Sequence, residues 1–338
     1  MNIENMEHRD KTRYLQKEIK QISDDMRIKY PILKHQNALG LGIMLTSIAI
    51  ISLSAYAYTI GVIPAWLCVI VAAVAASFVH ELEHDLIHYM YFKNNKIMHH
   101  LMMLLCWVVR PGTISPWVRR FIHLKHHKVS GTPEDIEEKA ITNGMPWGLK
   151  RLIMMMDPFV SMILGRDGGS WSKHVLHFMG GAAAFFPIGS FHFAVWYSFL
   201  VFHGTALASQ WFGFTPEWPV WFLSWVQSTE LYVVVFAIPH FIRQFSLNFI
   251  SSNMHYFGDI EEGNVVEQTQ VINAWWLAPF HLFCFNFGAT HAIHHFVVRD
   301  PFYIRQLTAK RAYVFMEEMG VRFNDYGTFG RSNRYSYS

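Results

Sequence analysis

Four long apolar stretches limit the folds that are open to this chain. They cover residues 37–59, 60–79, 176–208 and 218–242, and none contains Lys or Arg although the chain has 28 of these residues. A helix that crosses a bilayer needs about 20 apolar residues, so each stretch is long enough to do so. Gly61 and Pro64, and later the sequence GFTPEWP, can form the turns that pair these helices. The sequence predicts an all-α, polytopic membrane helix bundle with four transmembrane helices.

The basic residues predict how the bundle sits in the membrane. Eight lie in residues 1–36, twelve in residues 88–175 and the remaining eight after Ile242. Lys and Arg are enriched in cytoplasmic loops, so we expect both termini and a helical cap around residues 88–175 on the cytoplasmic side. Charged residues make up only 16% of the chain, against roughly 25% in soluble domains. We therefore expect an integral membrane protein. Because no retrieval tail is recognisable, we expect it in a bacterial inner membrane.

Histidine is unusually frequent, with 20 residues, and much of it lies in three short clusters. The first is HELEHDLIH, which starts at His80, and the other two, HLKHH and HAIHH, both read H-x-x-H-H. Residues three or four apart share one face of a helix, with β-carbons about 5–6 Å apart. Each cluster can therefore offer two or three imidazoles to one metal ion, and imidazole suits Zn, Cu, Fe and Ni alike.

The start of the first cluster, H-E-x-x-H, also matches a zinc-protease motif in which Glu81 would be the general base. That interpretation leaves both H-x-x-H-H clusters without a role, so we favour a larger, redox-active centre. Residues 60–79 form about 30 Å of helix, so His80 and His84 follow at the membrane boundary. A lipid-derived chain can reach a metal at that depth.

The order H-x-x-x-H, H-x-x-H-H, H-x-x-H-H on a chain with four spans resembles the membrane fatty acid desaturase superfamily. That superfamily also includes alkane and fatty acyl hydroxylases and decarboxylases that make terminal alkenes. The resemblance runs from about residue 40 to residue 305. It implies a non-haem di-iron centre, two iron ions held by imidazoles, that uses O2 to abstract hydrogen from an unactivated C–H bond. The implied ligands come from the three clusters and from SSNMHYFGD, and are His80, His84, His123, His126, His127, His255, His291, His294 and His295.

Two features of these motifs remain open. HELEHDLIH offers two overlapping pairs, His80 with His84 and His84 with His88. We favour the first because several relatives have H-E-x-x-H at this position.

Groups behind the ligands can fix a liganding imidazole by accepting its other N–H. The candidates for this shell are Glu81, Asp85, His88 and Asp259, although solvated surface roles are equally compatible with Asp85 and Asp259.

Glu230 is a separate candidate because it lies within the fourth apolar stretch. An ionisable group inside a membrane span suggests a functional site. Pairing with Gln227 or Ser228 is the structural alternative.

The resemblance implies three segments and an external source of electrons. Residues 1–36 form an amphipathic cytoplasmic segment with a helix ending before Pro31, residues 37–305 form the membrane-bound di-iron oxidase domain, and residues 306–338 form a C-terminal helix and tail. We expect the polar end after Arg322 to be loosely ordered. The chain has no G-x-G-x-x-G fingerprint and no cysteine cluster, so a separate ferredoxin, rubredoxin or cytochrome would supply electrons.

The expected substrate is a fatty acid or fatty acyl lipid, with membrane lipids as neighbours and no nucleic-acid partner. Among the reactions we favour desaturation. Decarboxylation to a terminal alkene and hydroxylation remain the alternatives, because pocket shape decides between them.

Overall fold

A computed structural model describes residues 6–165 and 171–336 of the chain. Throughout these ranges the regular structure is helical, and extended pairing is limited to two isolated bridges, His255–Thr269 and Val271–Phe323. The prediction of an all-α fold is confirmed. The first five residues of the predicted N-terminal segment and the last two of the tail lie outside the described residues.

Among the described residues, four helices are long and apolar enough to cross a membrane, as the sequence predicts. The fourth is a helical run of 35 residues, Val220–Met254, that contains one π-helical turn. In order along the chain they are α2 (Gln36–Thr59), α3 (Ala65–Ile87), α10 (Ile188–Phe212) and the run of α11 (Val220–Tyr232), η3 (Val233–Ala237) and α12 (Ile238–Met254).

The third predicted span is wrong in its extent. Residues 176–208 belong to two helices, α9 (Trp171–Phe185) and α10, which begins directly after Pro187. Proline lacks an N–H and its ring clashes with the preceding turn, so a helix breaks there. The apolar run continues through this break, which is why hydropathy alone did not reveal it.

Two of the long helices extend past the predicted spans. α3 starts after the Gly61–Pro64 turn and continues to Ile87, so it carries His80 and His84 on its last turns. The helix Val220–Met254 has 35 residues, about 52 Å at 1.5 Å per residue, against about 30 Å of bilayer hydrocarbon. Its last turns therefore deliver His255 beyond the apolar layer.

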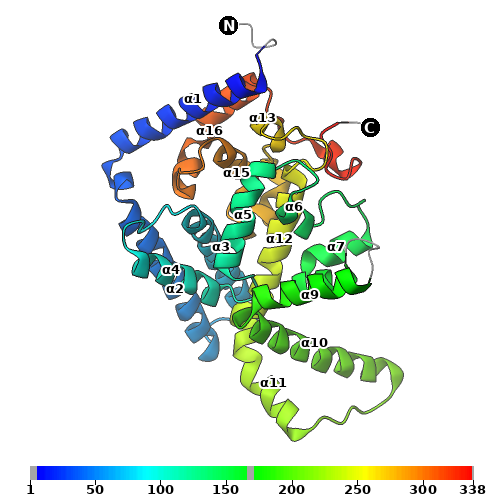
Figure 1. Ribbon diagram of the computed structural model, residues 1–338. Helices are drawn as coiled ribbons and strands as arrows, with labels where there is room; N and C mark the ends of the chain where they lie inside the picture. The colour runs from blue at the N-terminus through cyan, green and yellow to red at the C-terminus, as the bar shows by residue number, and fades with distance from the viewer. Residues whose placement is uncertain (1–5, 166–170, 337–338) are drawn as a thin grey trace.

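Shorter helices connect the long ones and cover one end of them. Figure 1 shows α1 (His8–Lys29) lying across the end of the molecule opposite the α10–α11 turn, and α1 ends before Pro31 as predicted. The others are η2 (Pro31–Lys34), α4 (Lys96–Val109), α5 (Pro116–Val129), α6 (Ile136–Ala140), α7 (Leu149–Met156), α8 (Pro158–Leu164), α13 (Val265–Gln268), η4 (Trp275–Leu277), α14 (Ala278–Phe283), α15 (Phe287–Phe296), α16 (Phe302–Glu318) and η5 (Tyr326–Phe329).

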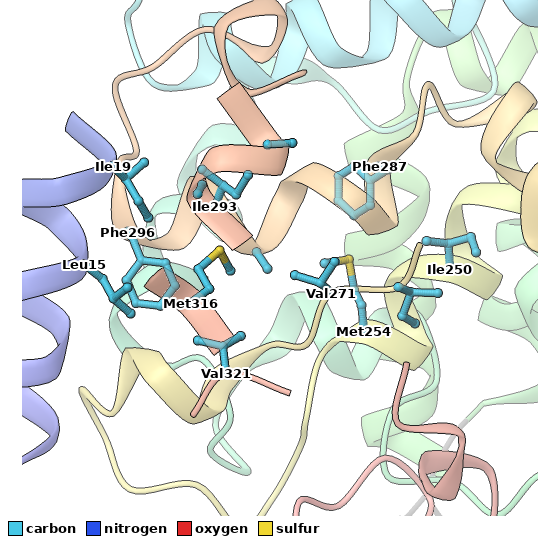
Figure 2. Packing of buried hydrophobic residues seen from close by; sticks show 14 of the residues in the cluster. Leu15, Ile19, Ile250, Met254, Val271, Phe287, Ile293, Phe296, Met316 and Val321 are labelled. Carbon is cyan, nitrogen blue, oxygen red and sulfur yellow. The ribbon is translucent and has the colours of Figure 1, made fainter. Parts of the chain in front are cut away.

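A hydrophobic cluster fixes α15, the helix that carries HAIHH, between α1, α12 and α16 (Figure 2). Burying a side chain of this size contributes roughly 1.5–3 kcal/mol, so the packing holds α15 at one rotation. The buried members include Leu15, Ile19, Ile250, Met254, Ile293, Phe296 and Met316.

The C-terminal tail is ordered as far as it is described, and the prediction of a loose tail is wrong there. Phe323 pairs with Val271, and the amides of Tyr335 and Ser336 donate to the Asp259 carboxylate. Asn333 is fully buried and donates to the Ser252 carbonyl. Polar composition suggested exposure, but these polar groups have partners within the protein.

Candidate metal centre

Histidines from four helices converge in one region. α3 brings His84 and, at its C-terminal cap, His88, while α12 ends at His255. The clusters HLKHH and HAIHH lie on α5 and α15. Two sets of four have ligand atoms within 4.8 Å of one another: the His84 group, which is His84, His88, His123 and His294, and the His126 group, which is His126, His255, His291 and His295.

The His84 group has the spacing of ligands around one ion. The Nε2 atom of His88 lies 3.0 Å from that of His123 and 3.0 Å from that of His294. His127 lies beside them. Its Nε2 atom is 3.0 Å from the Nε2 atom of His294, 3.2 Å from that of His123 and 3.3 Å from that of His88. With metal–nitrogen bonds of about 2.1 Å, neighbouring ligand atoms lie about 3.0 Å apart in an octahedron and about 3.4 Å apart in a tetrahedron. These imidazoles therefore fit a transition-metal ion.

The His126 group lies directly beside the first. The ring centroids of His126 and His255 are 5.2 Å apart, and those of His291 and His295 are 5.1 Å apart. Within the described residues, Nε2 of His255 and Nε2 of His295 are buried without a hydrogen-bond partner. Burying such an atom without a partner lowers the stability of the fold by about 1–3 kcal/mol. A metal ion bound to the atom would offset this loss. The ring centroid of His127 is 4.8 Å from that of His294 and 5.0 Å from that of His295. His127 therefore lies between the two groups.

Three acidic side chains hold the outer faces of these rings. Nδ1 of His126 donates to Asp135 at 2.7 Å, and Nδ1 of His123 donates to Glu137 at 2.8 Å. Nδ1 of His255 donates to the Ser251 carbonyl at 2.9 Å and lies 3.4 Å from Glu138. Metal-bound histidines usually donate their second N–H in this way, which leaves Nε2 for the ion. The sequence analysis missed this set, although its signal, TPEDIEEK, closely follows HLKHH.

Burial sets the protonation of most of these rings. It lowers the pKa of His88 to about 2 and that of His255 to about 4, so both are neutral with a free lone pair at neutral pH. His126 differs. Burial lowers its pKa, but Asp135, Glu137 and Glu138 more than offset this and raise the pKa to about 9. A metal ion must therefore displace a proton from this ring.

His80 does not reach either group, although the sequence analysis favoured it as a ligand. Its Nε2 lies 3.0 Å from Nη2 of Arg119, and its Nδ1 lies 3.4 Å from Glu81. A guanidinium can only donate, so Arg119 occupies the Nε2 lone pair that a metal would need. Of the two overlapping pairs, the structure brings together His84 and His88.

The other predicted supporting residues have different surroundings. Nη2 of Arg305 contacts Asp85 at 3.1 Å and Glu81 at 3.5 Å, and all three side chains are buried. Asp85 also accepts the Phe302 amide and the Tyr91 hydroxyl, both at 3.0 Å. These carboxylates anchor α16 to α3. Asp85 also lies 4.0 Å from Nδ1 of His84, which is too long for a hydrogen bond.

Two predicted residues lie apart from the centre. Asp259 is exposed and binds the tail amides. Glu230 is exposed on α11, and in the described part of the chain it makes no hydrogen bond with Gln227 or Ser228. The Ser228 hydroxyl donates instead to the Trp225 carbonyl.

A cavity of about 720 Å³ reaches the histidines. Its size is within the roughly 300–1,000 Å³ of small-molecule sites. Its lining includes His80, His84, His123, His126, His255 and His291. The remaining wall is mostly apolar and includes Ile114, Val118, Ile122, Ile136, Met154, Met162, Leu176, Ala184, Phe185, Leu247 and Phe287.

Replacing Asp135 with asparagine should weaken metal retention without unfolding α6. Asp135 caps α6 by accepting the amides of Glu137 and Glu138, and asparagine caps as well as aspartate. The lost carboxylate at His126 should cost roughly 10–100-fold in metal affinity, measured by competition with a chelator. Asp157→Asn is the control, because Asp157 caps α8 in the same way and contacts no clustered histidine. Equal metal retention in the two variants would contradict this role for Asp135.

The comparisons with known proteins agree with this geometry. The family model for fatty acid desaturase matches residues 60–327, a range that holds every clustered histidine and the whole cavity lining. A search of curated proteins gives no match. With four membrane-length helices, the match identifies an integral membrane protein of an oxidoreductase family. The chain belongs to the fatty acid desaturase family.

Proposed function

We propose that this protein is an O2-dependent di-iron enzyme that oxidises an unactivated C–H bond of a fatty acyl chain, and that the reaction is desaturation. The observation that carries the proposal is that histidines of two adjacent groups line one largely apolar cavity. A largely apolar cavity lined by potential metal ligands would present the carbon chain of a substrate to them.

The assigned ligands differ from the sequence expectation at one position. We assign His84, His88, His123, His127 and His294 to one iron and His126, His255, His291 and His295 to the other. His80 is then a cavity residue. When bound, the iron pair would supply the activation of O2 for hydrogen abstraction.

The protein's own residues position the rings and exclude water. Asp135 and Glu137 hold the Nδ1 protons of His126 and His123 and so direct both Nε2 atoms inward. The apolar wall of the cavity excludes water and aligns a hydrocarbon chain. Desaturation removes two hydrogen atoms from adjacent carbons, and with O2, two protons and two electrons it yields two water molecules. The electrons would come from a separate ferredoxin, rubredoxin or cytochrome.

The membrane arrangement is part of the proposal. The basic residues at both ends and in residues 88–175 support a cytoplasmic metal centre and cytoplasmic termini. The membrane would be a bacterial inner membrane. Residues 37–305 would form the catalytic unit. A basic cytoplasmic face would also attract an acidic electron carrier.

Incubation with a fatty acid series tests the function. The protein in lipid nanodiscs is given saturated acids from dodecanoic to octadecanoic, O2 and a reducing system, and the products are separated by gas chromatography–mass spectrometry. We expect a product that is two hydrogens lighter, and bound iron by metal analysis. A single zinc without any oxidised product would support the zinc-protease alternative.

The substitution Ala184→Phe should shorten the preferred chain. Ala184 lines the cavity on α9, and filling packed space costs about 1–3 kcal/mol. We expect the ratio of octadecanoic to dodecanoic acid turnover to fall roughly tenfold. Ala183→Phe is the control, because Ala183 is the exposed neighbour outside the cavity. A ratio unchanged by Ala184→Phe would mean that the chain lies elsewhere.

A further inference from the structure

Close to the metal centre, two arginines share one carboxylate, and a third lies near them without one. Nη1 of Arg110 contacts Glu83 at 3.0 Å, and Nη1 of Arg119 contacts the other oxygen of Glu83 at 2.8 Å. Among the described residues Arg243 pairs with no carboxylate, and its Nη2 donates to Gln244 at 2.9 Å. The nearby carboxylates Glu81 and Asp85 are bound by Arg305. We call Arg110, Arg119 and Arg243 the arginine group.

This positive charge is buried and has unused hydrogen-bond donors. Arg110 is 2% exposed, Arg243 is 0% exposed and Glu83 is 0% exposed. Within the described ranges Nε of Arg110, and Nε and Nη1 of Arg243, lack partners. Buried charges are stable only when they are paired. The surplus of guanidinium over carboxylate therefore favours binding of an anion.

Two members of the arginine group stand at the wall of the cavity, whereas Arg243 lines a smaller space that it shares with Arg110. Arg110 and Arg119 both line the cavity, together with His80, His84 and His123. On α5 Arg119 precedes His123 by one turn, and on α3 His80, which Arg119 contacts, precedes His84 by one turn. One turn is about 6 Å, so two helices place the arginine group at a similar short distance from the His84 group.

We propose that the arginine group binds the carboxylate of a free fatty acid and places the first carbons of its chain beside the His84 group. This inference rests on the proposed function. A guanidinium matches a planar carboxylate through two parallel N–H···O bonds. A thioester or a glycerol ester has a neutral carbonyl at this end of the acyl chain and would leave the arginine group uncompensated. The substrate class that fits is therefore the free acid.

The anchoring also restricts where the chain is oxidised. A carboxylate about one helical turn from the His84 group brings the carbons nearest to it to the metal, rather than those in mid-chain. Two products meet this condition. One is the 2-alkenoic acid, and the other, where the carboxylate leaves as CO2, is the terminal alkene one carbon shorter. Counted from the bound carboxylate, the 2-alkenoic acid requires O2, two protons and two electrons from the external carrier. The terminal alkene requires one proton more, because the negative charge is lost when neutral CO2 leaves. Each reaction releases two water molecules.

Binding to the metal-free protein tests the carboxylate site separately from catalysis. The full chain in nanodiscs is titrated with radiolabelled dodecanoic acid and with methyl dodecanoate. We expect the acid to bind roughly 10–100-fold more tightly, the size expected for hydrogen bonds to a charged group. Equal affinities would overturn the inference.

Two variants with opposite expected signs strengthen the test. Arg119→Gln should remove most of the preference for the acid and leave ester affinity unchanged, whereas Glu83→Gln should tighten acid binding by freeing both guanidinium groups. General damage to the fold cannot produce both results. Lys128→Gln removes one charge from the exposed face of the same helix and should change neither affinity. Weaker acid binding in Glu83→Gln would overturn the inference.

The two proposals fail differently. Oxidised products without any preference for the acid, or a new double bond in mid-chain, would overturn the carboxylate site and leave the proposed function standing. Tight acid binding without oxidation under any reductant would support the carboxylate site and overturn the proposed function.

Discussion

The substitution His88→Ala should remove one of the two irons and abolish oxidation. The Nε2 atom of His88 is within 3.3 Å of three other imidazole nitrogens. Even the loss of a supporting partner behind a ligand costs roughly 10–100-fold in metal affinity, and the loss of the ligand itself should cost more. Iron per chain, measured by elemental analysis after gel filtration, gives the result independently of turnover.

Two further variants calibrate this measurement. His84→Ala should lose iron whichever pair of the first cluster is used. His80→Ala should keep both irons, since Arg119 occupies its Nε2. The reverse pattern, with iron lost from His80→Ala and kept in His88→Ala, would restore the H-E-x-x-H pairing.

The substitution Arg305→Met should destabilise the protein by about 3–5 kcal/mol, the cost of removing one partner from a buried ion pair. Arg305 is 1% exposed and is the guanidinium that contacts both Glu81 and Asp85. Without it two carboxylates stay buried on α3, next to His80 and His84. Unfolding in detergent, followed by circular dichroism against denaturant, measures the change.

An exposed ion pair between α16, the helix that carries Arg305, and α1 provides the control. Arg311 contacts Asp25 at 3.5 Å, with both side chains largely exposed, at 55% and 43%. Exposed pairs contribute about 0–1 kcal/mol, so Arg311→Met should change little. Adding Glu81→Gln and Asp85→Asn to Arg305→Met should recover part of the loss. An Arg305→Met protein as stable as Arg311→Met would show that the buried contact is not important for stability.

Much of the convergence of the histidines could be predicted from the sequence because the clustered histidines lie at helical spacing. HLKHH and HAIHH each occupy one helix, so local geometry alone brings their rings to one face. The choice between His80 and His88 could not be predicted in this way, since both pair with His84 at the same spacing. It depends on Arg119, which is 39 positions from His80 and reaches it only in the folded protein.

The carboxylates behind the ligands depend on a turn that the sequence analysis did not use. Gly131 has φ +85°, and a Cβ there would lie 2.6 Å from Ile260. Glycine is therefore needed to reverse the chain between α5 and α6, which brings Asp135 back to His126. The arginine group was missed for a similar reason, because its members come from three separate segments.

The π-helical turn η3 sets which side of α12 meets the cavity. Gln244, Leu247, Asn248, Ser251 and His255 recur at helical spacing, and all of them line the cavity. Each residue of an α-helix advances about 100° around the axis, so adding or removing one residue within Val233–Ala237 would swing this whole row, His255 included, away from the metal centre. A change of length at the start of α11 leaves this register intact, whereas a change between η3 and His255 would separate the two halves of the centre.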